Sequence, residues 1–149
     1  MTACFFGHRN TDSSITTILR FEIEKHIEKG ANVFYVGGDG NFDIIATDIL
    51  RELQEKHSHI SVYRILAYLP TEKDEYSFKQ HERTIFPESL EFVPRRFAIK
   101  FRNRWMVEQS DFVIAYIQLN YGGAYEAMKY AERKNKKITE LSPNILYLV

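Results

Sequence analysis

Glycines and charged residues gather at three places in the sequence where an apolar segment ends. "TACFF" runs into "GHR", "ANVFYV" runs into "GGDGNFD", and "DFVIAYI" leads through "QLNY" to a glycine pair. Six of the seven glycines stand at these places, so the places are the first candidates for a binding site. The candidate binding residues there are Gly7, His8, Arg9, Gly37, Gly38, Gly40, Asp43, Gly122 and Gly123.

Glycine turns that precede a helix are suited to holding a phosphate group. Without a Cβ atom, backbone N–H groups can approach the phosphate oxygens, and the helix N-terminus adds unpaired donors and a partial positive charge. The alternative is that each glycine only closes a short turn between a strand and a helix. Three such turns at one edge of a sheet favour the phosphate-holding interpretation.

Asp43 stands where the dinucleotide-binding fingerprint has its third glycine, so "GGDGNFD" is not a standard NAD-binding motif. A carboxylate suits the positive end of a helix, but it would repel a pyrophosphate placed there. Two roles for Asp43 therefore stay open. It accepts hydrogen bonds from ribose hydroxyls or organises the loop, or it caps the helix together with Asn41.

His8 and Arg9 follow the first apolar segment directly. Arg9 could pair with a phosphate through two hydrogen bonds, and His8 could donate to a phosphate or act as an acid or base. A solvated His–Arg pair in a loop is the alternative. Hydrolysis of an N-glycosidic bond needs a carboxylate and a water-activating base. The candidate catalytic residues for such a reaction are His8, Asp43 and Glu126.

Motifs for other chemistries are absent from the sequence. It has no G-x-S-x-G elbow, no Walker A motif and no Cys/His spacing typical of zinc. We interpret His57 and His59 as residues of a solvated loop and Cys4 as an inert thiol in a buried strand. We expect no metal ion and no resident cofactor.

Strand and helix patterns alternate along the chain. The predicted strands are residues 2–6, 31–36, 60–69, 90–94, 111–117 and 136–141. The predicted helices lie between residues 11 and 30 and at 42–56, 95–110 and 122–135, while 71–89 is predicted as a short helix or lid-like excursion. This alternation predicts an α/β, Rossmann-like three-layer fold with a mostly parallel sheet and helices on both faces. Without a linker or repeat, residues 1–149 are expected to form a single domain.

The charge balance limits the classes of partner. Twenty basic and twenty acidic residues cancel, so binding to nucleic acid would require a local basic patch. Four basic residues of the helix at 95–110 are interpreted as a solvated face: Arg95, Arg96, Lys100 and Arg104. No segment approaches the roughly 20 apolar residues of a membrane helix, and no signal peptide is recognised, so we expect a cytoplasmic protein without a membrane partner.

Four segments, in this order, resemble the SLOG superfamily of Rossmann-like domains: "CFFGHR", "GGDGNFD", "RNRWMVEQSDFVIA" and "YGGAYEAMKYA". This superfamily includes the DprA/Smf DNA-processing proteins, the Lonely-guy phosphoribohydrolases and the YpsA-like bacterial proteins of uncertain function. The chain is most similar to the YpsA-like group, with its "GHR", its "GGA-x-GFD"-like turn and its "RN-x-x-M" helix before an "SD-x-x-IA" strand. The resemblance spans nearly the whole chain.

The resemblance implies a nucleotide-type ligand, such as an ADP-ribose-like molecule, in the crevice beyond the strand ends. It adds Arg102 and Asn103 to the candidate binding residues and leaves Met106 as a packing residue. One departure concerns catalysis. The glutamate of the Lonely-guy motif PGG-x-GT-x-x-E has no counterpart here, because Lys129 stands at that position.

Three functions from different classes remain open. The main hypothesis is a domain that binds or senses a nucleotide or nucleotide derivative of the ADP-ribose or NAD type. The second is a phosphoribohydrolase-like or other nucleotide-cleaving enzyme that hydrolyses an N-glycosidic or phosphate bond. The third is single-stranded nucleic-acid binding, as in the DprA-like relatives, through the basic helix and exposed aromatic residues. The aromatic-rich composition also allows a homodimer.

Overall fold

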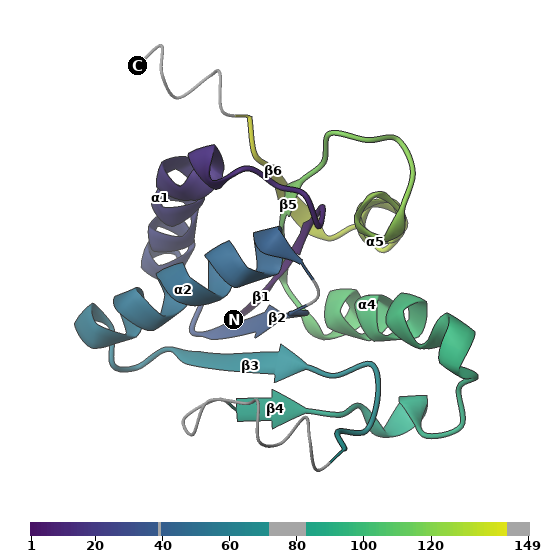
Figure 1. Ribbon diagram of the computed structural model, residues 1–149. Helices are drawn as coiled ribbons and strands as arrows, with labels where there is room; N and C mark the ends of the chain where they lie inside the picture. Colours follow the sequence, from purple (N-terminus) through teal and green to yellow (C-terminus); the bar gives the residue numbers. More distant parts are fainter. Residues whose placement is uncertain (39, 72–82, 143–149) are drawn as a thin grey trace.

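A parallel sheet of six strands forms the middle layer, with helices on both of its faces (Figure 1). The computed structural model describes residues 1–38, 40–71 and 83–142. The strand order is β4-β3-β2-β1-β5-β6, and every neighbouring pair is parallel. The predicted α/β, Rossmann-like fold class is therefore confirmed. The strands are β1 (Thr2–Gly7), β2 (Val33–Val36), β3 (Ser61–Ile65), β4 (Arg83–Ile85), β5 (Phe112–Tyr116) and β6 (Lys137–Glu140).

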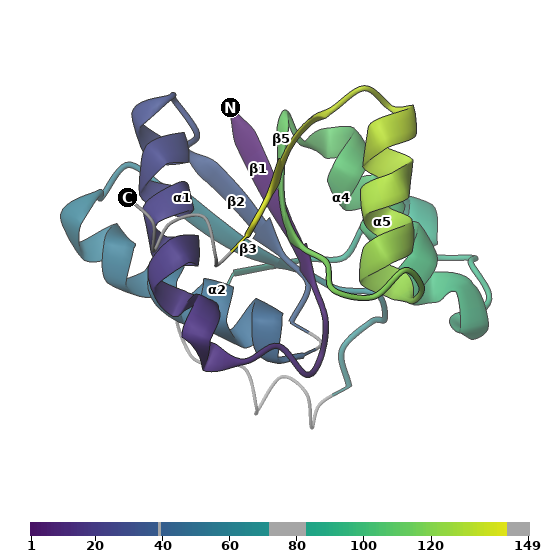
Figure 2. The ribbon, with the colours of Figure 1, turned by 90° about the horizontal axis from the view of Figure 1, so that it is seen from above.

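The helices divide between the two faces of the sheet, as Figure 2 shows. On one face lie α1 (Thr16–Glu28) and α2 (Asn41–Lys56), and on the other lie α4 (Ala98–Gln109) and α5 (Gly123–Arg133). Short 3-10 helices precede α1 and α4 and follow β4: η1 (Ser13–Ile15), η3 (Arg95–Phe97) and η2 (Glu88–Leu90). Among the described residues, no helix is long and apolar enough to cross a membrane.

Two apolar layers join the helices to the sheet. Successive side chains of a strand point to opposite faces, so a strand buried on both faces has a continuous apolar run. In β1, Ala3 and Phe5 belong to the layer under α1 and α2, whereas Cys4 and Phe6 belong to the layer under α4 and α5. Complete burial raises the pKa of the Cys4 thiol to about 12, which agrees with its interpretation as inert.

The strand order reverses between β1 and β5. The chain moves outward from β1 through β2 and β3 to β4, and then returns to place β5 on the other side of β1. In open α/β sheets, ligands bind outside the carboxyl ends of the strands at such a reversal. The turns after β1, β2 and β5, which contain the glycines, meet at this end of the sheet.

The predicted strand at residues 90–94 is wrong. Leu90 ends η2, and the backbone N–H groups of Leu90, Glu91 and Val93 donate to carbonyl oxygens three residues earlier. These local hydrogen bonds use the donors that a strand would need. The fourth strand is Arg83–Ile85, inside the segment predicted as a short helix or lid, and residues 72–82 of that segment lie outside the described part of the chain.

The other predicted elements are found with shifted ends. The strand predicted at 60–69 is shorter, at Ser61–Ile65, and the helix predicted at 95–110 begins as η3 before α4. The first helix is preceded by η1, where the Asp12 side chain accepts a hydrogen bond from the Ser14 N–H and so caps this 3-10 helix.

His26 makes the stability of the fold sensitive to pH. Its side chain is 2% exposed, its Nδ1 hydrogen-bonds the Glu22 carbonyl oxygen at 2.7 Å, and its Nε2 lies 3.4 Å from the Thr139 hydroxyl on β6. Burial lowers the pKa of His26 in the folded state, and Lys29 and Lys25 act in the same direction. The unfolded chain therefore takes up a proton first as the pH falls.

We predict that the free energy of unfolding is highest above the ordinary histidine pKa of about 6.5 and declines as the pH falls through the lower folded value. Urea unfolding at pH 7.5 and pH 5.0 measures this decline. A His26→Gln variant cannot titrate there, so its decline should be smaller than that of the wild type. An equal decline in both proteins would show that His26 is not the group responsible.

Candidate functional site

A cavity of about 210 Å³ lies at the carboxyl ends of β1 and β2, between the starts of α2 and α5 and the side of α4. We call it the strand-end pocket. It is lined by Phe5, Phe6, Gly7, His8, Arg9, Gly37, Gly40, Asp43, Ile99, Arg102, Asn103, Met106, Gly123 and Ala124. Nine of the eleven predicted binding residues are in this lining, and Gly38 and Gly122 are not.

Gly38 and Gly122 have backbone reasons to be glycine. Both have positive φ angles, 87° and 96° respectively, which other residues rarely adopt. A Cβ atom on Gly38 would also lie 2.5 Å from Nε of Arg64. Substitution of Gly38 would therefore strain the chain whether or not a ligand binds.

Gly7 has a packing reason as well. A Cβ atom there would lie 2.1 Å from Cγ of Phe42, a fully buried residue in the first turn of α2. The absence of a side chain at Gly7 thus lets α2 pack against the end of β1. Its presence alone is no evidence for a phosphate.

Two helices begin at the pocket without a side-chain cap. At α2, Gly40 is the N-cap, and the Asn41 N–H donates to the Arg9 carbonyl oxygen at 3.0 Å. The N-cap residue, a glycine, has no side chain with which to cap the helix. At α5, Gly122 is the N-cap, and Gly123 of the first turn lines the pocket.

Arg102 is buried in the pocket wall, with 3% of its surface exposed. Its Nη1 donates to the carbonyl oxygens of Gly37 at 3.2 Å and Ile65 at 3.1 Å. Gly37 directly follows β2, and Ile65 is the last residue of β3. Its Nε donates to Oδ1 of Asn103 at 2.9 Å. The predicted binding residue Arg102 therefore also joins α4 to two strand ends.

Asn103 is oriented by this contact. Since its Oδ1 accepts from Arg102, the amide nitrogen Nδ2 is directed elsewhere, and it lies 3.9 Å from where a Cβ on Gly123 would stand. A side-chain N–H₂ donor is thus placed next to the first turn of α5. Backbone donors of a helix N-terminus and this amide would face the same anion.

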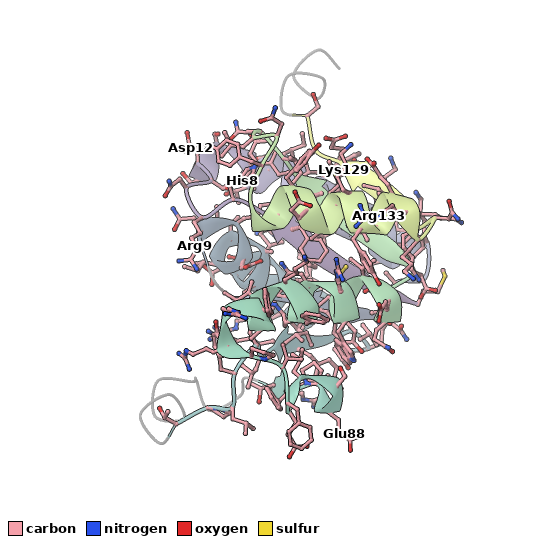
Figure 3. All side chains as sticks on the ribbon, turned by 90° about the vertical axis from the view of Figure 1, so that its right-hand side faces the viewer. His8, Arg9, Asp12, Glu88, Lys129 and Arg133 are labelled. Carbon is pink, nitrogen blue, oxygen red and sulfur yellow. The ribbon has the colours of Figure 1, made fainter. Side chains whose placement is uncertain are left out.

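His8 is engaged by the loop after β5. Its Nε2 accepts hydrogen bonds from the backbone N–H groups of Gln118 at 3.0 Å and Leu119 at 3.2 Å. Two such bonds require Nε2 to be unprotonated, and burial lowers the pKa of His8 in agreement with a neutral ring. Figure 3 shows His8 beyond the beginning of α5, on the same side of the molecule as Lys129 and Arg133.

The three candidate catalytic residues do not share one cavity. His8 and Asp43 line the strand-end pocket, whereas Glu126 lines a separate groove between α4 and α5. Arg9 lies at the exposed mouth of the pocket, and Met106 is fully buried, as expected of a packing residue. Within the described ranges, no group of three or more His, Cys, Asp or Glu residues could hold a metal ion.

The basic residues before and on α4 lie over aromatic rings. Cζ of Arg95 is 4.3 Å from the centre of the Tyr68 ring, and Cζ of Arg96 is 4.8 Å from that of Phe97. Arg104 lies over the rings of Phe101 and Tyr130, at 5.7 and 5.0 Å. The predicted solvated face is therefore a surface of alternating cations and aromatic rings.

Sequence reasoning missed two parts of the site. The groups that contact His8 are the backbone N–H groups of Gln118 and Leu119. Because this contact does not depend on the type of side chain, the sequence did not predict it. The apolar lining by Ile99 and Ala124 depends on how closely α4 and α5 approach the sheet. Helical spacing indicates that such residues face inward but not which cavity they border.

Two solved protein structures have a fold similar to that of this chain. No protein-family model matches the chain, and no curated protein sequence matches it. The structure of DNA processing protein A from Helicobacter pylori, described for its single-stranded DNA binding mode, matches with a TM-score of 0.67 and 16% identity over 95% of this chain. DprA from Streptococcus pneumoniae matches with a TM-score of 0.52 and 12% identity over 98% of this chain.

The chain spans less than two thirds of these two proteins, 65% and 60% respectively. Identities this low establish a shared fold and nothing finer. The shared fold agrees with the α/β, Rossmann-like class that the sequence predicts.

The contacts of Arg102 predict that its loss destabilises the protein. Arg102→Met keeps an apolar chain of similar length but removes the donors to two strand-end carbonyl groups. We expect the free energy of unfolding to fall by about 2–4 kcal/mol, since buried acceptors lose their partner. Arg9→Met is the matched control, because Arg9 lines the same pocket but is exposed, and it should leave stability unchanged. Wild-type stability in Arg102→Met would mean that Arg102 does not hold the strand ends.

Proposed function

We propose that the strand-end pocket binds a nucleotide unit, with its phosphate at the start of α5 and its ribose at Asp43. The observation that carries this proposal is the first turn of α5. That turn has no side-chain cap, lines the pocket with Gly123 and Ala124, and has the amide of Asn103 beside it. A helix N-terminus of this kind attracts anions through its N–H groups and its dipole.

The charges in the pocket separate two subsites. Asp43 belongs to α2, on the opposite face of the sheet from α5, so its carboxylate comes from the other wall. Its Oδ2 lies near the Arg102 guanidinium, because both lie within 3.4 Å of where a Cβ on Gly37 would stand. A phosphate is disfavoured directly against the carboxylate and is favoured at the first turn of α5. Ribose hydroxyl groups, which are donors, suit the carboxylate, and Arg9 at the mouth can pair with the phosphate.

The volume of the strand-end pocket suits one part of a larger ligand. Sites for drug-sized ligands occupy about 300–1,000 Å³, whereas this cavity measures about 210 Å³. A phosphate and a ribose fit a volume of that order, and the remainder of the ligand would extend beyond the pocket. We therefore also propose that the protein binds or senses a nucleotide derivative. We propose in addition that it is related to the YpsA-like proteins.

An enzymatic role has less support. A hydrolase would need His8 or another base free to activate water. The Nε2 atom of His8 is occupied by two backbone donors, and Glu126 lies outside the strand-end pocket. Cleavage of the bound nucleotide would therefore require the loop after β5 to move.

Single-stranded DNA is the second candidate ligand. The observation that favours it is the structural similarity to a DNA processing protein A described for its single-stranded DNA binding mode. The cation and aromatic surface before and on α4 is of the kind that binds single strands by stacking and phosphate contacts. The zero net charge of the chain counts against a long electrostatic contact.

Gly123→Asp tests the phosphate subsite. The backbone of Gly123 does not need glycine, and the nearest atom to an added Cβ is 3.9 Å away. A carboxylate in the first turn suits the helix dipole, so stability should be unchanged or slightly raised, but the carboxylate would repel a phosphate. We expect at least a roughly tenfold loss of affinity for AMP, equal to about 1.4 kcal/mol. Gly123→Asn has nearly the same shape without the charge and should lose much less.

Thermal unfolding with and without AMP, ADP, NAD or ADP-ribose is the readout. A ligand at a hundred times its dissociation constant adds about 2.7 kcal/mol, a shift of roughly 5–11 °C for a chain of this size. Equal shifts in wild type and Gly123→Asp would contradict the phosphate subsite.

A dT20 oligonucleotide, titrated at 50 and 200 mM salt, tests the second candidate. If DNA is the ligand, affinity should fall steeply with salt. Undetectable or salt-independent binding of dT20 would remove single-stranded DNA as a candidate.

A further inference from the structure

A second cavity, of about 330 Å³, runs between α4 and α5. Figure 3 shows these two helices side by side, with Arg133 on α5. We call this cavity the α4–α5 groove. It is lined by Ile99, Lys100, Asn103, Arg104, Gly123, Glu126, Ala127, Tyr130 and Arg133.

The α4–α5 groove adjoins the strand-end pocket. Ile99, Asn103 and Gly123 line both cavities. The shared residues include the first turn of α5, where the phosphate of the proposed ligand would lie. The two cavities therefore border the place where the phosphate would lie, and a group attached to that phosphate would be next to the groove.

The chemistry of the groove differs from that of the pocket. Ile99, Ala127 and the ring of Tyr130 provide an apolar surface. Lys100, Arg104 and Arg133 provide three positive charges against the single negative charge of Glu126. A base can stack on the guanidinium groups that lie over the Tyr130 ring, and a phosphate can pair with the cations, so the groove suits a base that carries a phosphate.

The Tyr130 ring is fixed in position by its neighbours. Cζ of Arg104 lies 5.0 Å and Cζ of Arg133 lies 5.6 Å from the ring centre. Its hydroxyl group donates to the Glu108 carboxylate. Because these guanidinium groups lie over the ring, a base would stack on a guanidinium plane that the ring supports, a surface that needs little reorganisation when a ligand binds.

We propose that the α4–α5 groove holds a second nucleotide unit, so that the full ligand consists of two nucleotide units joined through the phosphate at the start of α5. This inference rests on the proposed function of the strand-end pocket. The two units can be joined by a pyrophosphate, as in a free dinucleotide, or by a phosphodiester, as in a nucleic-acid strand. The same two cavities receive either form.

The test compares three probes by isothermal titration calorimetry. AMP carries one unit, diadenosine diphosphate carries two joined by pyrophosphate, and the dinucleotide pApA carries two joined by phosphodiester. We expect at least one of the two-unit probes to bind ten or more times as tightly as AMP. The tighter of the two identifies the linkage and therefore the source of the ligand.

A Lys100→Ala/Arg133→Ala variant removes the exposed cations of the groove. Both side chains lie on the surface, so the variant should keep its fold, which thermal unfolding checks. Its affinity for AMP should stay within about twofold of wild type, while the advantage of the two-unit probe should fall to threefold or less. Lys129→Ala is the matched control, because Lys129 is a partly exposed cation on α5 that does not line the groove.

Each outcome bears on a different step. If AMP binds and neither two-unit probe binds more tightly, the groove holds no second unit. If a two-unit probe binds more tightly but the double variant keeps that advantage, the second unit lies elsewhere. If no probe binds at all, the proposed function of the strand-end pocket is overturned, and this inference is overturned with it.

Discussion

The buried guanidinium group of Arg102 is the constraint on which this end of the molecule depends. A charge removed from water is costly unless hydrogen bonds satisfy it. Arg102 extends from α4 and donates to carbonyl oxygens at the ends of β2 and β3. The position of α4, the ends of two strands and the orientation of Asn103 are therefore fixed together. The strand-end pocket is the space that this arrangement leaves between α4, α2 and the first turn of α5.

The glycines around the pocket have two kinds of role. Gly7 makes room for Phe42, and Gly38 adopts a backbone conformation that other residues avoid. These are requirements of packing and chain direction. Gly123 has neither requirement, since its φ is not positive and a Cβ would meet only ordinary contacts. The open first turn of α5 is thus the part of the glycine pattern that points to a ligand.

The sequence predicted the layers of the fold and much of the pocket lining. Strands buried on both faces, such as "FVIAY", have a continuous apolar pattern, and α2 has its apolar residues at helical spacing. The strand wrongly predicted at 90–94 failed because its local hydrogen bonds form turns. The partners of Arg102 and the groove between α4 and α5 depend on contacts between residues far apart in the chain. A pattern within one segment carries no information about such contacts.

The most direct test of the nucleotide pocket is an NMR titration of the ¹⁵N-labelled protein with AMP. If the phosphate binds at the start of α5, the amide signals of Gly123 and Ala124 should shift most, accompanied by those of the first turn of α2 near Asp43. Saturable shifts at these positions would establish the pocket as the nucleotide site. Shifts confined to the far side of the sheet around β3 and β4, or no shifts at millimolar AMP, would contradict it.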